Sequence, residues 1–438
     1  MRSVKKYEVA NIHLFKQQLL EWSKHYDEIT WLDSNNYQQN HSRFDAVLAL
    51  QAFTLIKTDY VHAFDKLQEY QQTTKDWIFG YLSYDLKNDV EQLKSNNLDL
   101  LDFPELYFFQ PQKLIFIKNN EVEFQYLRIV DDEMDSDFKE IHKLEINTLK
   151  RAATSQKGEI QSRISPSQYL ERIQELLAHI HRGDIYEANF CQEFYLEDTS
   201  IEPFQVFKDL NALSLSPFAT FFKWENNYLL SASPERYLQK KGNKIISQPI
   251  KGTARRDENE TIDLRIAKEL EEDLKERSEN IMIVDLVRND LSHTAKKGSV
   301  KVEELCKIYS FRQVHQMIST VTSELADGIP PVKVLRSTFP MGSMTGAPKI
   351  SAMKIIEELE VSKRGLYSGA VGYFTPEGDF DFNVVIRSIL FNANSNYVSF
   401  SVGGAITAKS IPQKEYEECL LKSKAMREVL LNGIKELK

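Results

Sequence analysis

The arrangement of strands and turns in the middle of the chain restricts the fold more than any other feature. Apolar segments at 218–222 and 228–233 flank Asn226-Asn227, which predicts a β-hairpin. Apolar side chains at helical spacing predict a helix over 167–182, and the alternating residues 185–194 predict a strand. Hairpins interspersed with helices, without a regular strand–helix–strand alternation, indicate a mixed α+β fold.

The N-terminal part of the chain also favours strands. Two apolar segments flank the Gln-Pro-Gln sequence at 110–112, which predicts two antiparallel strands joined by a turn. Further along, the polar stretch of small residues at 152–165 is the best candidate for a boundary. We therefore predict an N-terminal region at 1–160 and a second region at 161–438. The 438 residues have room for two or three average domains or for one large one.

Composition excludes several classes of protein. A net charge of -9 argues against nucleic acid or an acidic membrane surface as the main partner. No apolar run approaches the roughly 18 residues of a membrane span, and the N-terminus lacks the apolar core of a signal peptide, so a cytoplasmic location is expected. Three widely separated cysteines, Cys191, Cys306 and Cys419, fit a reducing compartment and argue against a structural zinc site.

Two groups of carboxylates stand at helical spacing. Glu276 and Glu279 lie three residues apart, and Glu415, Glu418 and Lys422 follow an i, i+3, i+7 pattern that places them on one helix face. Either group alone is most simply a solvated helix surface. Four carboxylates from two facing helices can instead hold a hard divalent cation, for which Mg²⁺ is suited because it takes oxygen ligands.

A lysine and a glutamate are candidates for catalysis. Lys251 lies within Pro-Ile-Lys-Gly-Thr at 249–253, after a predicted strand at 244–248 and before a charged stretch at 254–258 that is predicted to be helical. Its amine is either exposed and solvated or a nucleophile whose pKa is lowered by burial. Glu235 follows a proline at a strand-to-turn corner; it is either a general acid with a raised pKa or the ion-pair partner of Arg236.

Glycine-rich segments occur late in the chain. Residues 342–349 and 403–407 are predicted turns whose backbone amides can cradle an anion. Neither matches a nucleotide-binding fingerprint, so nucleotide binding is only weakly supported. Arg387 ends an apolar strand and is a plausible two-pronged partner for a carboxylate.

Four longer motifs carry a resemblance to a known family. Residues 279–291, 342–349, 367–372 and 415–418 resemble the chorismate-utilising enzymes, and the similarity extends over about residues 165–435. The resemblance implies an α+β fold in which two packed antiparallel β-sheets carry helices on the outside and a cleft holds the active site. It also implies that the N-terminal region contributes strands to this sandwich.

Three positions choose among members of the family. Members that add water carry a lysine where this chain has Gln192, which speaks against isochorismate and salicylate synthases. Anthranilate synthases usually carry alanine where this chain has Lys251 and histidine where it has Gln316, although His315 stands one place earlier. Lys251 is similar to the lysine of aminodeoxychorismate synthase component I. Anthranilate synthase component I and a catalytically idle chorismate-binding partner remain the alternatives.

The resemblance to the aminating members implies a reaction and a site. Chorismate and ammonia, the latter from a separate glutamine amidotransferase subunit, would form 4-amino-4-deoxychorismate for para-aminobenzoate and folate synthesis. Lys251 would form a covalent adduct with the ring while Glu235 protonates the departing hydroxyl. Mg²⁺ would be held by Glu279 and Glu418, with Glu276 and Glu415 in support. The implied substrate contacts are Tyr367, Arg387, Gly403, Gly404, Ala405, Lys422, Ser343 and Thr253.

Overall fold

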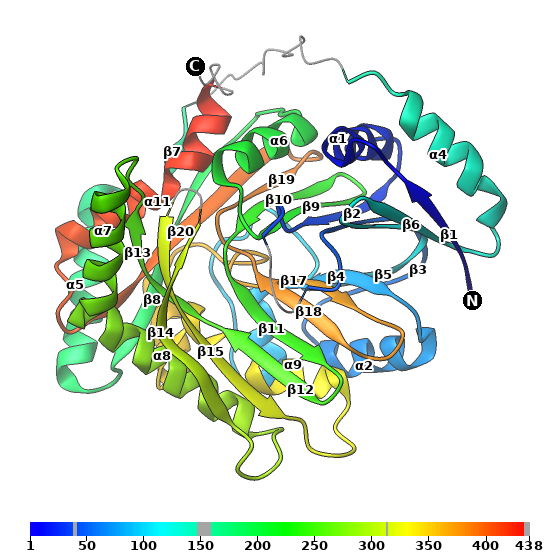
Figure 1. Cartoon of the computed structure of the whole chain (residues 1–438). Coiled ribbons are helices and arrows are strands. Elements are labelled where there is room, and N and C mark those ends of the chain that lie inside the picture. The colour runs from blue at the N-terminus through cyan, green and yellow to red at the C-terminus, as the bar shows by residue number, and fades with distance from the viewer. Residues whose placement is uncertain (38–41, 147–158, 312–313, 433–438) are drawn as a thin grey trace.

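A computed structural model describes residues 1–37, 42–146, 159–311 and 314–432 of the chain (Figure 1). Twenty strands in these residues form one hydrogen-bonded network, and the strands pair antiparallel. The network has two parts, here called the first and the second sheet, which share the long strand β5. Helices lie around the outside of both sheets (Figure 1).

The first sheet contains most of the longer strands. Its order of pairing is β1 (Arg2–Glu8), β6 (Glu121–Leu127), β5 (Leu106–Lys118), β3 (Ala46–Thr58), β2 (Glu28–Asp33), β9 (Phe218–Trp224), β10 (Asn227–Ser233), β19 (Ser388–Asn392), β20 (Tyr397–Thr407) and β8 (Glu187–Leu196). Two short strands, β7 (Gln161–Ser162) and β16 (Gly346–Ala347), also pair with β8.

The second sheet branches from β5. It runs through β4 (Ile78–Leu82), β17 (Ala370–Phe374), β18 (Phe380–Val384), β11 (Arg236–Lys241), β12 (Lys244–Gln248) and β15 (Val314–Glu324). Strands β13 (Ile250–Arg255) and β14 (Lys301–Ser310) both pair with β15.

Helices cover the sheets in two groups. Those whose apolar faces join the core of the first sheet are α1 (Ile12–Ser23), α4 (Met134–Lys143), α5 (Pro166–Arg182), α6 (Pro203–Ser214), α10 (Lys349–Leu359) and α11 (Pro412–Asn432). Those that join the core of the second are α2 (Ala63–Thr74), α3 (Lys87–Val90), α8 (Leu274–Ser292) and α9 (Pro331–Thr338). Helix α7 (Glu260–Glu272) packs on β13 and β14, and the 3₁₀ turns are η1 (Tyr84–Leu86), η2 (Asp131–Glu133) and η3 (Gly342–Met344).

Aromatic side chains join the two sheets face to face. Trp224 of β9 contacts Tyr81 of β4 with ring centroids 4.9 Å apart, and Phe222 meets the same tyrosine edge to face at 5.7 Å. These rings belong to one buried cluster that also contains residues of α8 and α9. The predicted α+β fold of two packed antiparallel sheets with outer helices is therefore confirmed, with the addition that β5 makes the sheets continuous.

Three local predictions were wrong. Residues 110–112 are not a turn, because β5 continues through Pro111, opposite a bulge in β3. Residues 254 and 255 are not helical, because they pair with His315 and Val314 of β15; α7 begins later, at Glu260, where Asn259 accepts the first amides. Residues 403–407 are not a turn but the end of β20, paired with β8.

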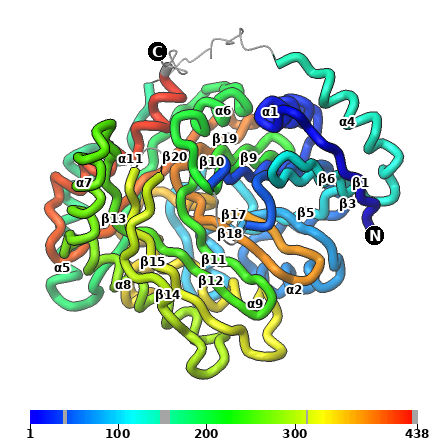
Figure 2. Tube along the Cα trace, viewed as in Figure 1, coloured from blue at the N-terminus to red at the C-terminus, as the bar shows by residue number. Residues whose placement is uncertain are grey.

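Segments far apart in the sequence lie side by side. The C-terminal helix α11 runs next to α5 and α6, as the tube in Figure 2 shows. Strand β2 pairs with β9, and β4 pairs with β17. Residues 147–158, which precede the predicted boundary at residue 160, lie outside the described residues, and that boundary stays a prediction. Among the helices described, none combines the length and the apolar character needed to cross a membrane.

Candidate active site

A glycine brings the strand of the candidate nucleophile against a carboxylate helix. Gly252 follows Lys251 at a bulge in β13 and has φ +93°, a conformation that favours glycine. A Cβ at this position would lie 3.2 Å from Oε2 of Glu276 on α8. The absence of a side chain therefore permits the close approach of β13 to α8 next to Lys251.

A second glycine, Gly404 of β20, lies next to the other carboxylate helix. A Cβ on Gly404 of β20 would lie 3.6 Å from Oε2 of Glu415, 3.7 Å from Nζ of Lys422 and 3.9 Å from Oε1 of Glu418, all on α11. Lys422 also donates a hydrogen bond to the carbonyl of Gly403 at 2.9 Å. The three α11 residues predicted to share one face thus lie together against β20.

The four carboxylates form one electrostatic group with nearby cations. Burial raises the pKa of Glu279 to about 7 and also raises the pKa of Glu276 and of Glu415. The pKa of Glu418 is instead lowered, chiefly by Lys422, whose Nζ lies 2.7 Å away. Negative charge on this group is therefore costly in the free protein, and a bound cation would offset that cost.

The same four carboxylates are the predicted metal site. Across the described ranges, no three Asp, Glu, His or Cys side chains lie close enough together to hold a metal ion. Two observations nevertheless fit a hard cation. All four predicted ligands present carboxylate oxygens, and Oε1 of Glu279 is buried without a hydrogen-bond partner. The donor chemistry suits Mg²⁺, and the ligand set itself stays a prediction.

Lys251 is held among carboxylates. Its Nζ lies 3.3 Å from Oε1 of Glu187, and only 12% of its side chain is exposed. Burial alone would lower the pKa of Lys251, but attraction to Glu187, Glu279 and Glu235 outweighs burial and raises the pKa. The expectation of a lowered lysine pKa is therefore wrong for the free protein, because the sequence did not reveal these neighbours.

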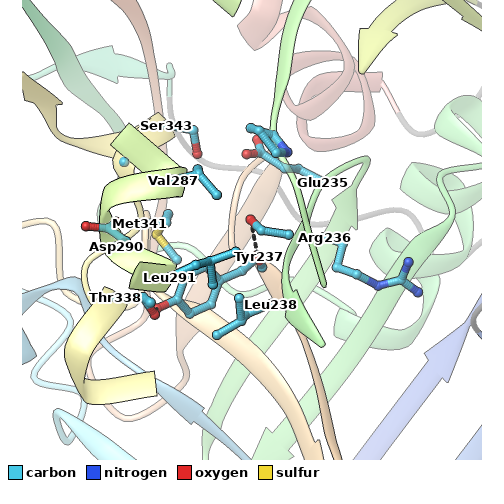
Figure 3. Close-up of a pocket in the computed structure, with 13 residues that line it drawn as sticks. Glu235, Arg236, Tyr237, Leu238, Val287, Asp290, Leu291, Thr338, Met341 and Ser343 are labelled. Atoms are coloured by element: carbon cyan, nitrogen blue, oxygen red, sulfur yellow. Dashed lines mark hydrogen bonds between the residues drawn. The ribbon is translucent and has the colours of Figure 1, made fainter. Parts of the chain in front are cut away.

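Glu235 lies in the loop between β10 and β11 and is buried. Burial raises the pKa of Glu235 to about 7, although a hydrogen bond from Ser343 and the charge of Lys251 act in the opposite direction. Arg236 is not its partner: the guanidinium points away from Glu235 (Figure 3) and binds Asp381, with Nε 2.9 Å from Oδ1. A carboxyl that is protonated near neutral pH can act as a general acid.

A small cavity of about 20 Å³ adjoins Glu235 and Ser343. Figure 3 shows the side chains that line it. It reaches between α8, α9 and β11, and Tyr237, Leu291 and Thr338 line its far part (Figure 3). Such a volume is about that of one ordered water, so the cavity is no substrate pocket by itself.

Tyr367 and Arg387 are the predicted carboxylate-binding pair. Tyr367 is buried, and its hydroxyl accepts a weak hydrogen bond from Sγ of Cys191 at 3.7 Å. Arg387 adopts φ +53°, and burial lowers its pKa. Within the part of the chain that the structure describes, the Arg387 guanidinium makes no hydrogen bond or ion pair. A half-buried guanidinium without a protein partner is suited to an anionic ligand.

The remaining predicted contacts differ in their surroundings. Thr253 is exposed on β13, whereas Ser343 is buried in η3. The carbonyl of Gly403 faces Lys422, and because the amide and carbonyl of one strand residue point to the same side, its amide faces that side too. Gly403, Gly404 and Ala405 lie opposite Cys191, Phe190 and Asn189 of β8. Because the direction of backbone groups alternates along a strand, the amide of Ala405 points to the same side as that of Gly403.

One residue of the site, Glu187, was not predicted from the sequence. Glu187, at the start of β8, is 1% exposed and contacts Lys251, yet its second oxygen, Oε2, is buried without a partner. The predicted strand over 185–194 contains it, but strand periodicity does not reveal which distant residue a side chain meets. The signal available was a carboxylate within a strand that is otherwise buried.

His315 does not substitute for the histidine expected at position 316. Its Nε2 lies 2.9 Å from Oδ1 of Asp263, and its Nδ1 lies 2.8 Å from the hydroxyl of Ser310. Consecutive strand residues point to opposite faces, so Gln316 and His315 project to different sides of β15. Gln316 lies opposite Thr253, and its Oε1 is buried without a partner.

Comparison with known proteins identifies the family. The family model of chorismate binding enzymes matches residues 27–428. The chain belongs to the chorismate-binding enzyme family. The aminodeoxychorismate synthase component 1 of Bacillus subtilis is 30% identical over 417 residues, which cover 93% of this chain and 84% of the relative. The component of that name from Salmonella typhimurium is 39% identical over 258 residues, covering 59% and 56%.

Other family members match over similar lengths. The anthranilate synthase component 1 of Thermus thermophilus is 33% identical over 357 residues, covering 80% of this chain and 76% of the relative. The crystal structure of anthranilate synthase component I from Streptococcus pneumoniae superposes with a TM-score of 0.76, at 24% identity, over 89% of this chain and 93% of that one. The structural likeness concerns the fold, and the family makes this chain a chorismate-binding enzyme.

Proposed function

We propose that this enzyme is component I of an aminodeoxychorismate synthase, which converts chorismate and ammonia to 4-amino-4-deoxychorismate. The observation that carries the proposal is the placement of Lys251 and Glu235 at one buried site, close enough for each charge to affect the pKa of the other group. A tethered amine and a protonated carboxyl are the nucleophile and the acid that this amination needs. The names of the two relatives that carry this activity support it.

Lys251 and Glu235 would catalyse two successive substitutions on the chorismate ring. The Lys251 nitrogen attacks C2 of chorismate while Glu235 gives its proton to the hydroxyl that leaves C4 as water. Ammonia then attacks C4, and the C2–N bond breaks so that lysine departs as an amine. Tethering gives the amine a high effective concentration, which compensates for the poor leaving group. Tyr367 and Arg387 would bind the enolpyruvyl carboxylate, and the amide of Gly403 and Lys422 would assist.

The carboxylates of α8 and α11 would hold Mg²⁺. Glu279 and Glu418 are the proposed direct ligands, and Glu276 and Glu415 would support them. When bound, the metal would supply positive charge for the ring carboxylate of chorismate. The buried Oε1 of Glu279, which has no hydrogen-bond partner and lies 3.7 Å from Nζ of Lys275, and the raised pKa values of three of the four carboxylates support this assignment.

A glutamine amidotransferase subunit is the proposed source of ammonia. The word "component" in the names of the relatives supports a partner. We also propose a cytoplasmic location and a role in the synthesis of para-aminobenzoate and folate. The three free, buried cysteines agree with a reducing compartment.

Anthranilate synthesis is the second candidate, because one relative at 33% identity carries that name. Two residues oppose it. Lys251 stands where alanine is expected in anthranilate synthases. These enzymes also carry a histidine where this chain has Gln316, and His315 does not replace it because its side chain binds Asp263. A catalytically idle partner is opposed by the burial of Glu235, Lys251 and Glu279 in one site.

The experiment combines purified chain, chorismate, Mg²⁺ and an ammonium salt, with products separated by chromatography. We expect 4-amino-4-deoxychorismate, detected as para-aminobenzoate after a lyase is added. Lys251→Ala should lower its formation by at least about a thousandfold, because a nucleophile is removed, and Lys268→Ala, on the exposed face of α7, is the matched control. Anthranilate as the product would establish the second candidate, and no product even with an amidotransferase present would establish the idle partner.

A further inference from the structure

The amine of Lys251 must lose a proton before it can attack. Its Nζ forms an ion pair with Glu187 on β8, and the carboxylates of Glu235, before β11, and Glu279, on α8, are near enough to act on its charge. Where these carboxylates are ionised, their charges favour the protonated amine in the free protein. An ammonium ion has no lone pair, so one of the neighbouring groups has to take the proton inside this buried site.

The three carboxylates are not equivalent. Glu235 has to carry a proton of its own to the departing hydroxyl, so it cannot accept one at the same time. Glu279 is a proposed ligand of Mg²⁺. Glu187 has neither role, and its Oε1 forms an ion pair with Nζ of Lys251 at 3.3 Å. Its Oε2 is buried without a partner, so this carboxylate has unused capacity for a proton.

We propose that Glu187 is a further catalytic residue, which accepts the proton from the Lys251 ammonium and returns it at the end of the cycle. The inference rests on the proposed amination. The first transfer leaves a neutral amine and a protonated Glu187, and the amine then forms the C2–N bond. When ammonia attacks C4, the C2–N bond breaks and its electrons return to the lysine nitrogen. The freed amine takes the proton back from Glu187, and the new C4 ammonium gives one to Glu235.

Glu187→Gln tests the proposal, because the amide keeps the shape and an oxygen for Lys251 but cannot accept a proton. We expect kcat to fall about a hundredfold or more, with the KM for chorismate little changed. At a fixed concentration of free ammonia, the ratio of variant to wild-type kcat should rise with pH, because the amine must then release its proton to solvent. Glu187→Asp should recover part of the lost kcat. Equal kcat values for Glu187→Gln and wild type, or a ratio that is independent of pH, would overturn the proposal.

Two further measurements separate this role from other causes. The rate at which acetic anhydride labels Lys251, followed by mass spectrometry, should be higher in Glu187→Gln, since a neighbouring negative charge is lost; an unchanged rate would overturn the contact. Glu193→Gln, another buried carboxylate on β8 that pairs with Arg163, should keep the wild-type kcat and pH profile. A wild-type chain that forms no aminated product refutes the proposed function instead.

Discussion

The burial of Glu235 has two effects: it makes the carboxyl a suitable general acid, and it lowers the stability of the folded protein at high pH. Burial raises its pKa from 4.5 to about 7, so between these values the folded protein binds a proton that the unfolded chain has released. Stability must therefore fall as pH rises through this window. At about pH 8 the folded state carries a buried, ionised carboxylate at a cost of about 3 kcal/mol.

Glu235→Gln should separate these two effects. We expect it to lower amination about a hundredfold to ten-thousandfold, because the acid is lost. The variant should also be more stable than wild type at about pH 8 and similar at about pH 5, since glutamine resembles the protonated acid. Urea unfolding at both pH values measures the difference. Glu377→Gln, an exposed carboxylate, is the control, and a variant destabilised equally at both pH values would contradict the account.

At the residue scale, the sequence predicts which residues belong to the site better than it predicts the neighbours of each residue. Lys251, Glu235 and the four helix carboxylates were chosen from the sequence, and the fold brings them into one region. Glu187 was not, because its contact with Lys251 joins β8 to β13, sixty-four positions apart. The direction of the Lys251 pKa shift was missed for the same reason. A pKa depends on neighbours supplied by tertiary structure, which residue spacing does not contain.

At the scale of elements, helices α8 and α11 each carry two of the four carboxylates that are proposed to hold Mg²⁺. Mg²⁺ should raise the melting temperature of the free protein, because a ligand that binds only the folded state stabilises it, by about 2.7 kcal/mol at a hundredfold excess over Kd. The rise should be larger above about pH 7, where Glu279 is ionised, than below it. A chelator should abolish the rise.

Variants on these helices test the ligand assignment. Glu279→Gln and Glu418→Gln should remove the Mg²⁺-dependent rise, whereas Glu417→Gln, exposed on the same helix as Glu418, should retain it. The readout is the melting temperature with and without the metal, so it does not depend on activity. If Glu279→Gln kept the full rise, the metal would be bound elsewhere.

Helices with clear periodicity were predictable, whereas the glycine-rich segment at 403–407 was not. The helix at 167–182 corresponds to α5, which begins after Ser165 and ends at Gly183 with φ +85°. Residues 403–407 suggested a turn because glycine is common in turns. In the protein these glycines lie in β20, where a Cβ on Gly403 would lie 2.4 Å from Sγ of Cys191 on the neighbouring strand β8. Glycine at this position permits the close approach of the two strands, which local composition does not distinguish from a turn.

At the scale of the whole molecule, the strand pairs β2–β9 and β4–β17 and the contact between the rings of Trp224 and Tyr81 tie the N-terminal strands to the rest. Strands β2 and β4 supply the edges on which β9 and β17 pair. We therefore expect residues 161–438, produced alone, to lack a cooperative thermal transition, because these edges and one side of the shared core would be exposed to water. Residues 1–160 produced together with them should restore the transition, as followed by near-ultraviolet circular dichroism. A sharp transition of 161–438 alone would instead make the predicted boundary at residue 160 one between two independent folding units.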